Sequence, residues 1–250
     1  MTPDDVMPVT RPPKSWGTLL LEIGVVVAII ALLIGLLLPN VAKVRTPAAR
    51  AHDANNLKQL GLGQHNYADN NQDGLLGPYA QISPGVMNTE LSFRVSLLPY
   101  MEESDTYRRI DLTQPWDSPR NALATSVAIK NLQSPDTPDA TKPDTPYRVF
   151  CGGGALFEAD GAPVKLAEVP DGTSNTILFV HATETVPWAK PQEFAYTRTT
   201  PLPPLGSPGM GKGFNVAFAD GSVRFLRHTI AEADLRSLIE KADGRAVVIE

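Results

Sequence analysis

The sequence predicts an α+β fold in which a long N-terminal helix, half of it transmembrane, precedes a loop-rich head of antiparallel strands and a C-terminal helix. Three observations support this prediction. Residues 19–38 form an almost uncharged apolar run. The rest of the chain is polar and rich in turn formers, since 23 Pro and 19 Gly occur among 250 residues. Asp220-Gly221 separates two strand-like segments and is the strongest hairpin signal in the chain.

The apolar run has the length of a membrane span. Glu22 is its only charged residue, and no proline occurs between Leu19 and Leu38. About 20 helical residues cover the roughly 30 Å of a bilayer core. Because apolar residues cover all sides, an amphipathic surface helix is disfavoured. A cleaved secretory signal is the alternative, although the run is long for one and the residues after Pro39 make a poor cleavage site.

The orientation of this span is not decided by charge. Arg11 and Lys14 before the run favour a cytoplasmic N-terminus, but Lys43, Arg45 and Arg50 follow on the other side. The positive-inside rule therefore leaves both orientations open.

The helix is expected to continue beyond the run. A narrow apolar stripe recurs at three- and four-residue spacing through Val41, Val44, Ala48, Ala51, Leu57, Leu60 and Gln64. Pro47 predicts a kink or a short break. The turn formers at 69–74 predict the end of the helix.

The head is expected to hold short elements between long loops. Two tight turns, Asp171-Gly172 and Asp220-Gly221, are assigned a structural role, and the second is predicted to be a type I′ hairpin turn. The expected elements are a short helix at 92–98, an exposed loop at 133–146, a strand at 147–150, a strand at 176–182, a loop at 187–213, strands at 214–219 and 222–226, a helix opened by a Thr229–Glu232 capping box and running to about residue 242, and a last strand at 245–249.

Composition and motifs exclude several classes of function. A net charge of −5 gives no basic footprint for nucleic acid. The single cysteine, Cys151, rules out an intrachain disulfide and a cysteine-based zinc cluster. No histidine pair has zinc-protease spacing, and no nucleophile elbow, phosphate loop or dinucleotide fingerprint occurs. We therefore expect a protein that is not an enzyme, with no catalytic residues, no metal and no cofactor.

One partial motif leaves a calcium site open. Asp69, Asn71, Asp73 and Gly74 match the first half of an EF-hand loop, but the twelfth position is Ala80 rather than the bidentate glutamate. A plain turn at the end of the helix is the preferred interpretation.

The N-terminal segment resembles a prepilin-type N-terminus. The resemblance rests on Gly17-Thr-Leu-Leu-Leu-Glu22 followed by the apolar run to Pro39. It implies that a prepilin peptidase cuts after Gly17 and that the new terminus at Thr18 is methylated. It also implies that Glu22, fifth from Thr18, serves assembly with pilin-like subunits. Thr18 stands where that family usually has Phe.

Further blocks resemble the planctomycete prepilin-like family that ends in an H-x(9)-DG domain of unknown function. Met210 stands where that family has the histidine of this motif, and Asp53 and Ser134 stand where many members have cysteines. The blocks follow one another in family order at residues 55–67, 97–102, 115–121, 171–177 and 215–226.

Together these features predict a leader at 1–17, a pilin-like helix at 18–68 with its transmembrane half at 18–39, and a periplasmic α+β head at 69–250. The resemblance implies a single-pass protein of the inner membrane with a cytoplasmic N-terminus. Its expected function is that of a pseudopilin-like structural subunit of a type II secretion or type IV pilus-like assembly. The alternative is a membrane-tethered module whose loops at 133–146 and 187–213 bind a solute or glycan.

Overall fold

The computed structural model describes residues 16–71, 74–136, 139 and 141–248, without the side chains of Thr18 and residues 34–45. The chain forms two compact units, Met1–Arg45 and Thr46–Glu250. Most of the predicted leader, Asp73 of the partial calcium motif and the end of the predicted last strand lie outside the described residues.

The first element, α1 (Trp16–Asn71), belongs to both units. Its side chains from Leu19 to Leu33 are exposed. Pro47 lies within the helix, so a break at that residue is wrong, while the alternative of a kink stays a prediction. Among the described residues, no helix combines the length and the hydropathy that a bilayer crossing requires.

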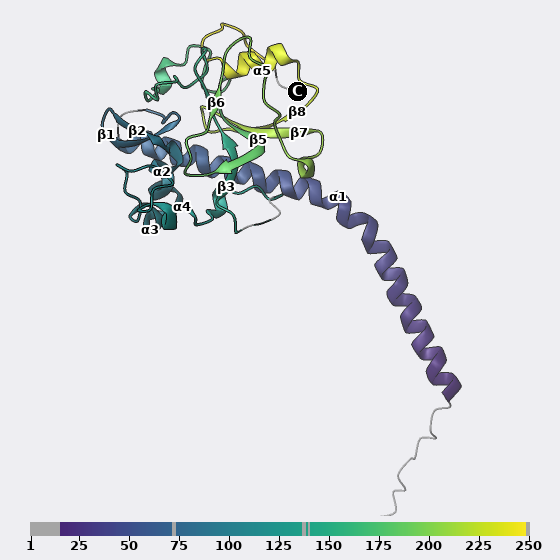
Figure 1. Cartoon of the computed structure of the whole chain (residues 1–250). Coiled ribbons are helices and arrows are strands. Elements are labelled where there is room, and N and C mark those ends of the chain that lie inside the picture. Colours follow the sequence, from purple (N-terminus) through teal and green to yellow (C-terminus); the bar gives the residue numbers. More distant parts are fainter. Residues whose placement is uncertain (1–15, 72–73, 137–138, 140, 249–250) are drawn as a thin grey trace, which may run out of the picture. The chain divides into compact units, whose positions relative to one another are not determined.

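From Thr46 onward, α1 packs on the α+β unit through one face, beside β3, β5 and β7 (Figure 1). The predicted stripe is correct at Leu57, Leu60 and Gln64, which are buried, and wrong at Ala48 and Ala51, which are exposed. The buried face instead begins at Ala49 and continues through Asp53, Asn56, Leu57, Leu60, Gln64 and Tyr67. Polar side chains occupy part of this face, and an apolar pattern could not reveal them.

A four-stranded antiparallel sheet forms the centre of this unit. Its strands lie in the order β3 (Asp144–Arg148), β5 (Ile177–Pro187), β7 (Gly213–Phe218) and β8 (Val223–Arg227). The register pairs Tyr147 with His181 and Val180 with Val216. This arrangement confirms the α+β class and the antiparallel sheet predicted from the sequence.

The two faces of the sheet serve different layers. Along β7, Phe214, Val216 and Phe218 pack in a cluster with Leu235, Leu238 and Ile239 of α5 (Glu232–Ile239). The intervening Asn215 and Ala217 face the side where α1 lies. Because side chains alternate along a strand, one sheet is covered by α1 on one face and by α5 on the other.

Two small sheets complete the strand structure. β1 (Tyr79–Ser83) and β2 (Val86–Ser92) form an antiparallel hairpin, while β4 (Phe150–Cys151) and β6 (Phe194–Ala195) pair in parallel. The remaining short helices are α2 (Phe93–Leu97), η1 (Leu98–Met101), α3 (Ser104–Tyr107), α4 (Ala122–Thr125), η2 (Lys130–Leu132), η3 (Leu166–Glu168) and η4 (Pro208–Met210). The short helix predicted at 92–98 is therefore confirmed as α2.

Several predicted boundaries are wrong. The C-terminal helix begins at Glu232 after Ala231, which gives no side-chain cap, so the Thr229–Glu232 capping box does not form. That helix ends at Ile239, and residues 245–248 form no strand. The predicted loop at 133–146 includes buried Ser134 and the start of β3, and the loop at 187–213 includes β6 and η4. Tertiary contacts, which local patterns do not encode, decide these boundaries.

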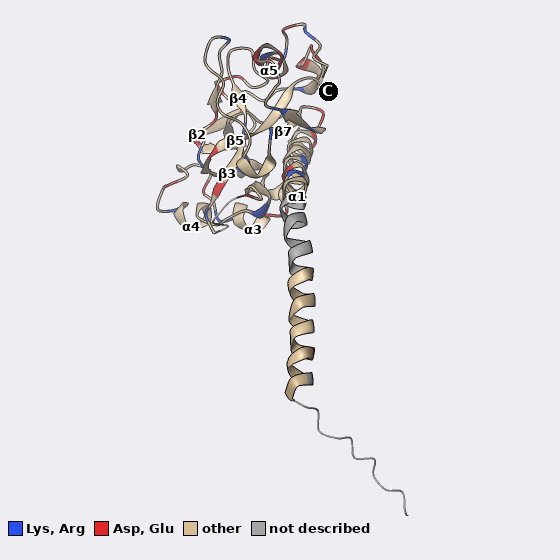
Figure 2. Ribbon diagram, turned by 90° about the vertical axis from the view of Figure 1, so that its right-hand side faces the viewer, with Lys and Arg blue, Asp and Glu red and all other residues tan. Residues whose placement is uncertain are grey.

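Charged residues occur in the loops of this unit and on the part of α1 that packs against it (Figure 2). Most are exposed, but Asp53, Arg94, Arg148 and Glu240 are buried. Buried charges need partners, so these four mark the polar part of the interior of this unit.

Candidate functional site

The residues predicted for processing and assembly lie in the first turns of α1. Gly17 and Glu22 are exposed, and the side chain of Thr18 is outside the described set. A partner of these residues would therefore approach the outer surface of this helix.

The Asp171-Gly172 turn joins two distant segments. The Asp171 carboxylate accepts hydrogen bonds from the backbone N–H groups of Asp243 at 2.6 Å and Gly244 at 3.0 Å. Gly172 has a φ of 89°, a conformation that favours glycine. The turn before β5 thus holds the segment that follows α5.

The Asp220-Gly221 turn is a hairpin turn of another type than expected. Gly221 has a φ of 76°, whereas Glu102 is the only described non-glycine residue with positive φ, so type I′ is wrong. The Gly221 N–H donates to Phe218 O, and the Phe218 N–H donates to Ser222 O, both at 2.8 Å. This pattern fits a three-residue loop in which a glycine in the left-handed region follows a type I turn.

This turn packs against α1. The Nζ of Lys58 donates to Gly221 O at 2.7 Å. A Cβ placed on Gly221 would lie 3.4 Å from the His65 ring. The Asp220 carboxylate accepts from the Ser222 N–H at 2.8 Å and so stays within the turn. The predicted turn residues consequently take part in the contact between helix and sheet.

A well-connected polar group of this unit is Asp53 on the buried face of α1. Its Oδ1 accepts from the hydroxyl of Tyr147 at 2.8 Å and from Nδ1 of His181 at 2.6 Å. Its Oδ2 accepts from Nδ2 of Asn215 at 2.8 Å. The donors come from β3, β5 and β7, so one carboxylate joins α1 to three strands.

The same contacts fix the chemistry of the surrounding groups. A carboxylate can only accept, so Nδ1 of His181 carries the proton of this hydrogen bond. The pKa of Tyr147 is raised well above its ordinary value. Burial is the largest cause, and the charge of the nearby Asp53 is the second. Tyr147 therefore remains a neutral donor in this cluster.

His181 also lines a cavity of about 430 Å³. The wall combines β5 with residues of both long loops that the sequence singled out, namely Ser134, Asp136, Asp139, Lys142, Asp144, Thr183, Thr185, Ser207 and Pro208. Hydroxyls and carboxylates dominate this lining. His181, Thr183 and Thr185 of β5 all line the cavity, in a stretch where the register between β3 and β5 is irregular.

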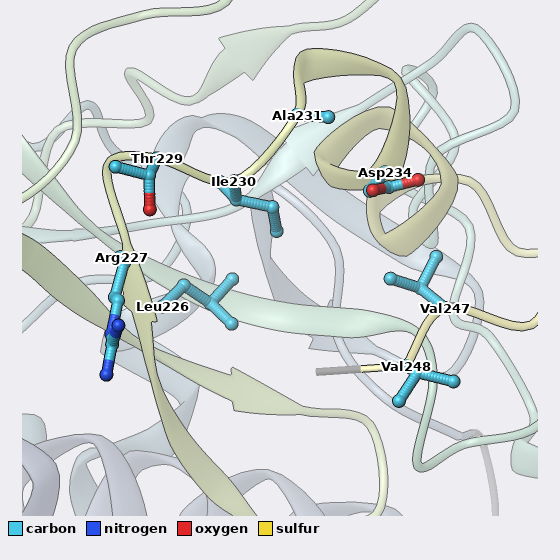
Figure 3. A pocket seen from close by; sticks show the side chains of 8 residues that line it. All are labelled: Leu226, Arg227, Thr229, Ile230, Ala231, Asp234, Val247 and Val248. Carbon is cyan, nitrogen blue, oxygen red and sulfur yellow. The ribbon is translucent and has the colours of Figure 1, made fainter. Parts of the chain in front are cut away.

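A second hollow, of about 360 Å³, lies between β8, α5 and the segment after it (Figure 3). The aliphatic side chains of Leu226, Ile230, Val247 and Val248 line it (Figure 3). Its carboxylate, Asp234, pairs with Arg245 at 3.7 Å. Its polar lining residues, Arg227, Thr229 and Asp234, are not buried, so this hollow has no enclosed polar side chain comparable to His181 among its described lining residues.

Neither a metal centre nor a reactive thiol emerges. Within the part of the chain that the structure describes, no three His, Cys, Asp or Glu side chains are grouped to hold a metal ion. Cys151 is buried, and this burial is the main cause that raises the pKa of its thiol. A thiol with a raised pKa stays protonated near neutral pH and is a poor nucleophile.

A comparison with protein families gives one match. A family described as proteins of unknown function (DUF1559) matches residues 43–203, which is more than half of the 250 residues. The chain belongs to the DUF1559 family. No curated protein and no solved structure matches it significantly. Within this DUF1559 chain the matched residues include Asp53, Tyr147 and His181 of the buried cluster and the cavity wall up to Thr185.

Sequence reasoning missed the cluster around Asp53 in this DUF1559 protein. His181 lies in the strand that the sequence predicted at 176–182, but its partner was not identified. Asp53 and Asn56 interrupt the apolar stripe of α1 one turn before Leu57 and Leu60. The available signal was a pair of polar residues on an otherwise apolar face of the helix. This signal indicated that the two side chains are buried, but not which residues they contact.

Proposed function

We propose that this protein is a pseudopilin-like structural subunit that acts without catalysis. A helix at 18–39 would anchor it in the inner membrane, with its N-terminus cytoplasmic and its head periplasmic. It would join a type II secretion or type IV pilus-like assembly. The supporting observation is α1, a 56-residue helix whose later part packs on an α+β unit while residues 19–33 are exposed and apolar.

The exposed apolar stretch supports an anchoring role. Eleven exposed Leu, Ile and Val side chains between Leu19 and Leu33 would be unfavourable in water, because each forgoes roughly 1.5–3 kcal/mol of burial free energy. Lipid or the helices of neighbouring subunits would remove this surface from water. Prepilin peptidase is the proposed processing partner, cutting between Gly17 and Thr18.

Glu22 gives this proposal its specificity. A carboxylate near the centre of a bilayer costs about 2.5–3.5 kcal/mol on insertion scales. The free amine of a neighbouring subunit, created by cleavage before Thr18, would pair with Glu22. Because a mismatched stagger leaves a charge unpaired in lipid, such a pair would fix the axial register between helices.

The test compares two substitutions of one residue. Glu22→Leu should keep the protein in the membrane fraction but abolish site-specific cross-linking between α1 helices of neighbouring subunits. Glu22→Asp keeps the carboxylate and should retain most of the cross-linking. Equal cross-linking by Glu22→Leu and the unchanged protein would reject the assembly function.

A second function, that of an anchored ligand-binding module, is favoured by the cavity beside His181. Ligand pockets are concave and carry a few well-placed polar groups, and their volumes are commonly about 300–1,000 Å³. Thr183→Phe should fill this cavity. A solute that raises the melting temperature of the unchanged protein should then lose its effect on the variant. If no solute in a panel of sugars, amino acids and amines stabilises the unchanged protein, this second function is wrong.

A further inference from the structure

We propose that the cavity beside His181 binds a small organic cation that carries primary ammonium groups. The proposal rests on the second function above, ligand binding, and names the class of ligand. Four observations support it: one ring nitrogen at the wall, the balance of charge, the balance of donors and acceptors, and the absence of aromatic side chains among the described residues of the wall.

The nitrogen is Nε2 of His181. The residue is only 1% exposed, and its Nδ1 is occupied by the bond to Asp53. No hydrogen bond joins Nε2 to a described residue, and His181 forms part of the cavity wall. When the ring is neutral and donates through Nδ1 to Asp53, Nε2 presents a lone pair to whatever occupies the cavity.

The charges of the wall favour a cation. Among the described residues of the wall, three carboxylates, Asp136, Asp139 and Asp144, outnumber one cationic side chain, Lys142. Lys142 is exposed, whereas Asp144 is half-buried and its carboxylate has no hydrogen bond or ion pair with any described residue. An unpaired, partly buried carboxylate in a concave site attracts positive charge.

The hydrogen-bonding pattern of the wall is complementary to that of a primary ammonium group. A primary ammonium carries three donors and no acceptor. The wall supplies the acceptors, namely the carboxylates, Nε2 of His181 and the hydroxyl oxygens of Thr183 and Thr185. Ser207 already donates its proton to Asp136, which fixes that carboxylate at the edge of the cavity.

Other cations fit this wall less well. Quaternary ammonium groups are bound by aromatic faces, and no Phe, Tyr or Trp occurs among the described residues of the wall. A metal ion would need grouped ligands, and no such group of three occurs among the described residues. A linear di- or triamine satisfies the charge, the donors and the volume together.

The experiment is a calorimetric titration of the full-length protein in detergent with spermidine, a linear triamine. We expect saturable binding that Asp144→Asn weakens about tenfold, the usual effect of losing one charge-assisted hydrogen bond. Thr183→Phe should remove binding by occupying the space. Asp117→Asn is the matched control, since it deletes an equally charged but exposed side chain outside the cavity wall. This control should bind spermidine as the unchanged protein does.

Three results would overturn the proposal. The first is the absence of saturable spermidine binding. The second is equal weakening by Asp144→Asn and Asp117→Asn, which would indicate general surface charge. The third is binding of the uncharged polyol sorbitol with the same dependence on Asp144 and Thr183. That third result would keep the ligand-binding function but reject a cationic ligand. None of the three results bears on the assembly function, which is tested by cross-linking through Glu22.

Discussion

At the scale of single residues, Gly221 illustrates how a turn and a packing contact coincide. Its φ of 76° lies in the left-handed region, and a Cβ there would also lie 3.4 Å from the ring of His65. Gly85, in the β1–β2 turn, has a similar φ of 74° but nothing within 4 Å of an added Cβ. The two glycines therefore separate the cost of backbone strain from the cost of a steric contact.

Gly221→Val should lower the free energy of unfolding by about 1–3 kcal/mol from backbone strain alone, and by more if the His65 ring must shift. Gly85→Val should show the strain without the contact. Chemical denaturation of both variants measures the difference. If Gly85→Val proves the more destabilising of the two, the contact with α1 has no energetic weight.

At the scale of elements, the joint between α1 and the sheet is polar at its centre. Asp53 is fully buried and accepts from donors on β3, β5 and β7. In the family that the sequence resembles, a cysteine often stands at this position, and Asp53 stands there instead. Hydrogen bonds therefore hold helix and sheet together here, in a chain that cannot form a disulfide of its own.

Asp53→Ala should destabilise the protein by about 3 kcal/mol or more, because it leaves several buried donors without an acceptor. Asp69→Ala removes an exposed carboxylate from the same helix and should change stability by less than about 0.5 kcal/mol. Thermal unfolding of both variants provides the comparison. Similar melting temperatures would show that the hydrogen bonds of Asp53 contribute little to the stability of the interface between α1 and the sheet.

At the scale of the whole molecule, folding buries groups that water would allow to ionise. Burial raises the pKa of the Cys151 thiol above its ordinary 9.0 and that of the Tyr147 phenol above its ordinary 10.0. Both groups are neutral when protonated. Their contribution to stability is therefore complete below the ordinary pKa and is lost as the pH rises, since only the unfolded chain ionises readily.

The free energy of unfolding should consequently fall from about pH 9 upward, by up to about 1.4 kcal/mol per pH unit for each group. Cys151→Ala removes the contribution of the thiol to this pH dependence. The free energy of unfolding of the variant should therefore fall less steeply between about pH 9 and 10. Urea unfolding at several pH values measures the slopes. Parallel curves for the variant and the unchanged protein would show that the thiol is not the source of the decline.

The sequence by itself determined the features that local chemistry controls. The β7–β8 hairpin followed from Asp220-Gly221 between strand-like segments, and the α+β class followed from the long helix and the turn-rich remainder. These features depend on residues close together in the chain, where propensity and periodicity carry the information. Even so, local residues did not reveal that the turn is of type I rather than type I′.

Only the tertiary structure decided which polar residues meet. Asp53 and His181 are separated by 128 positions, and no periodic pattern links them. The cavity wall likewise combines β5 with residues from two loops that sequence could only describe as rich in Pro, Asp and Gly. The sequence specifies each donor and acceptor, but the sheet register and the packing of α1 bring them within hydrogen-bond distance. Those long-range contacts are set by the burial of the whole core, which is why local patterns could not predict them.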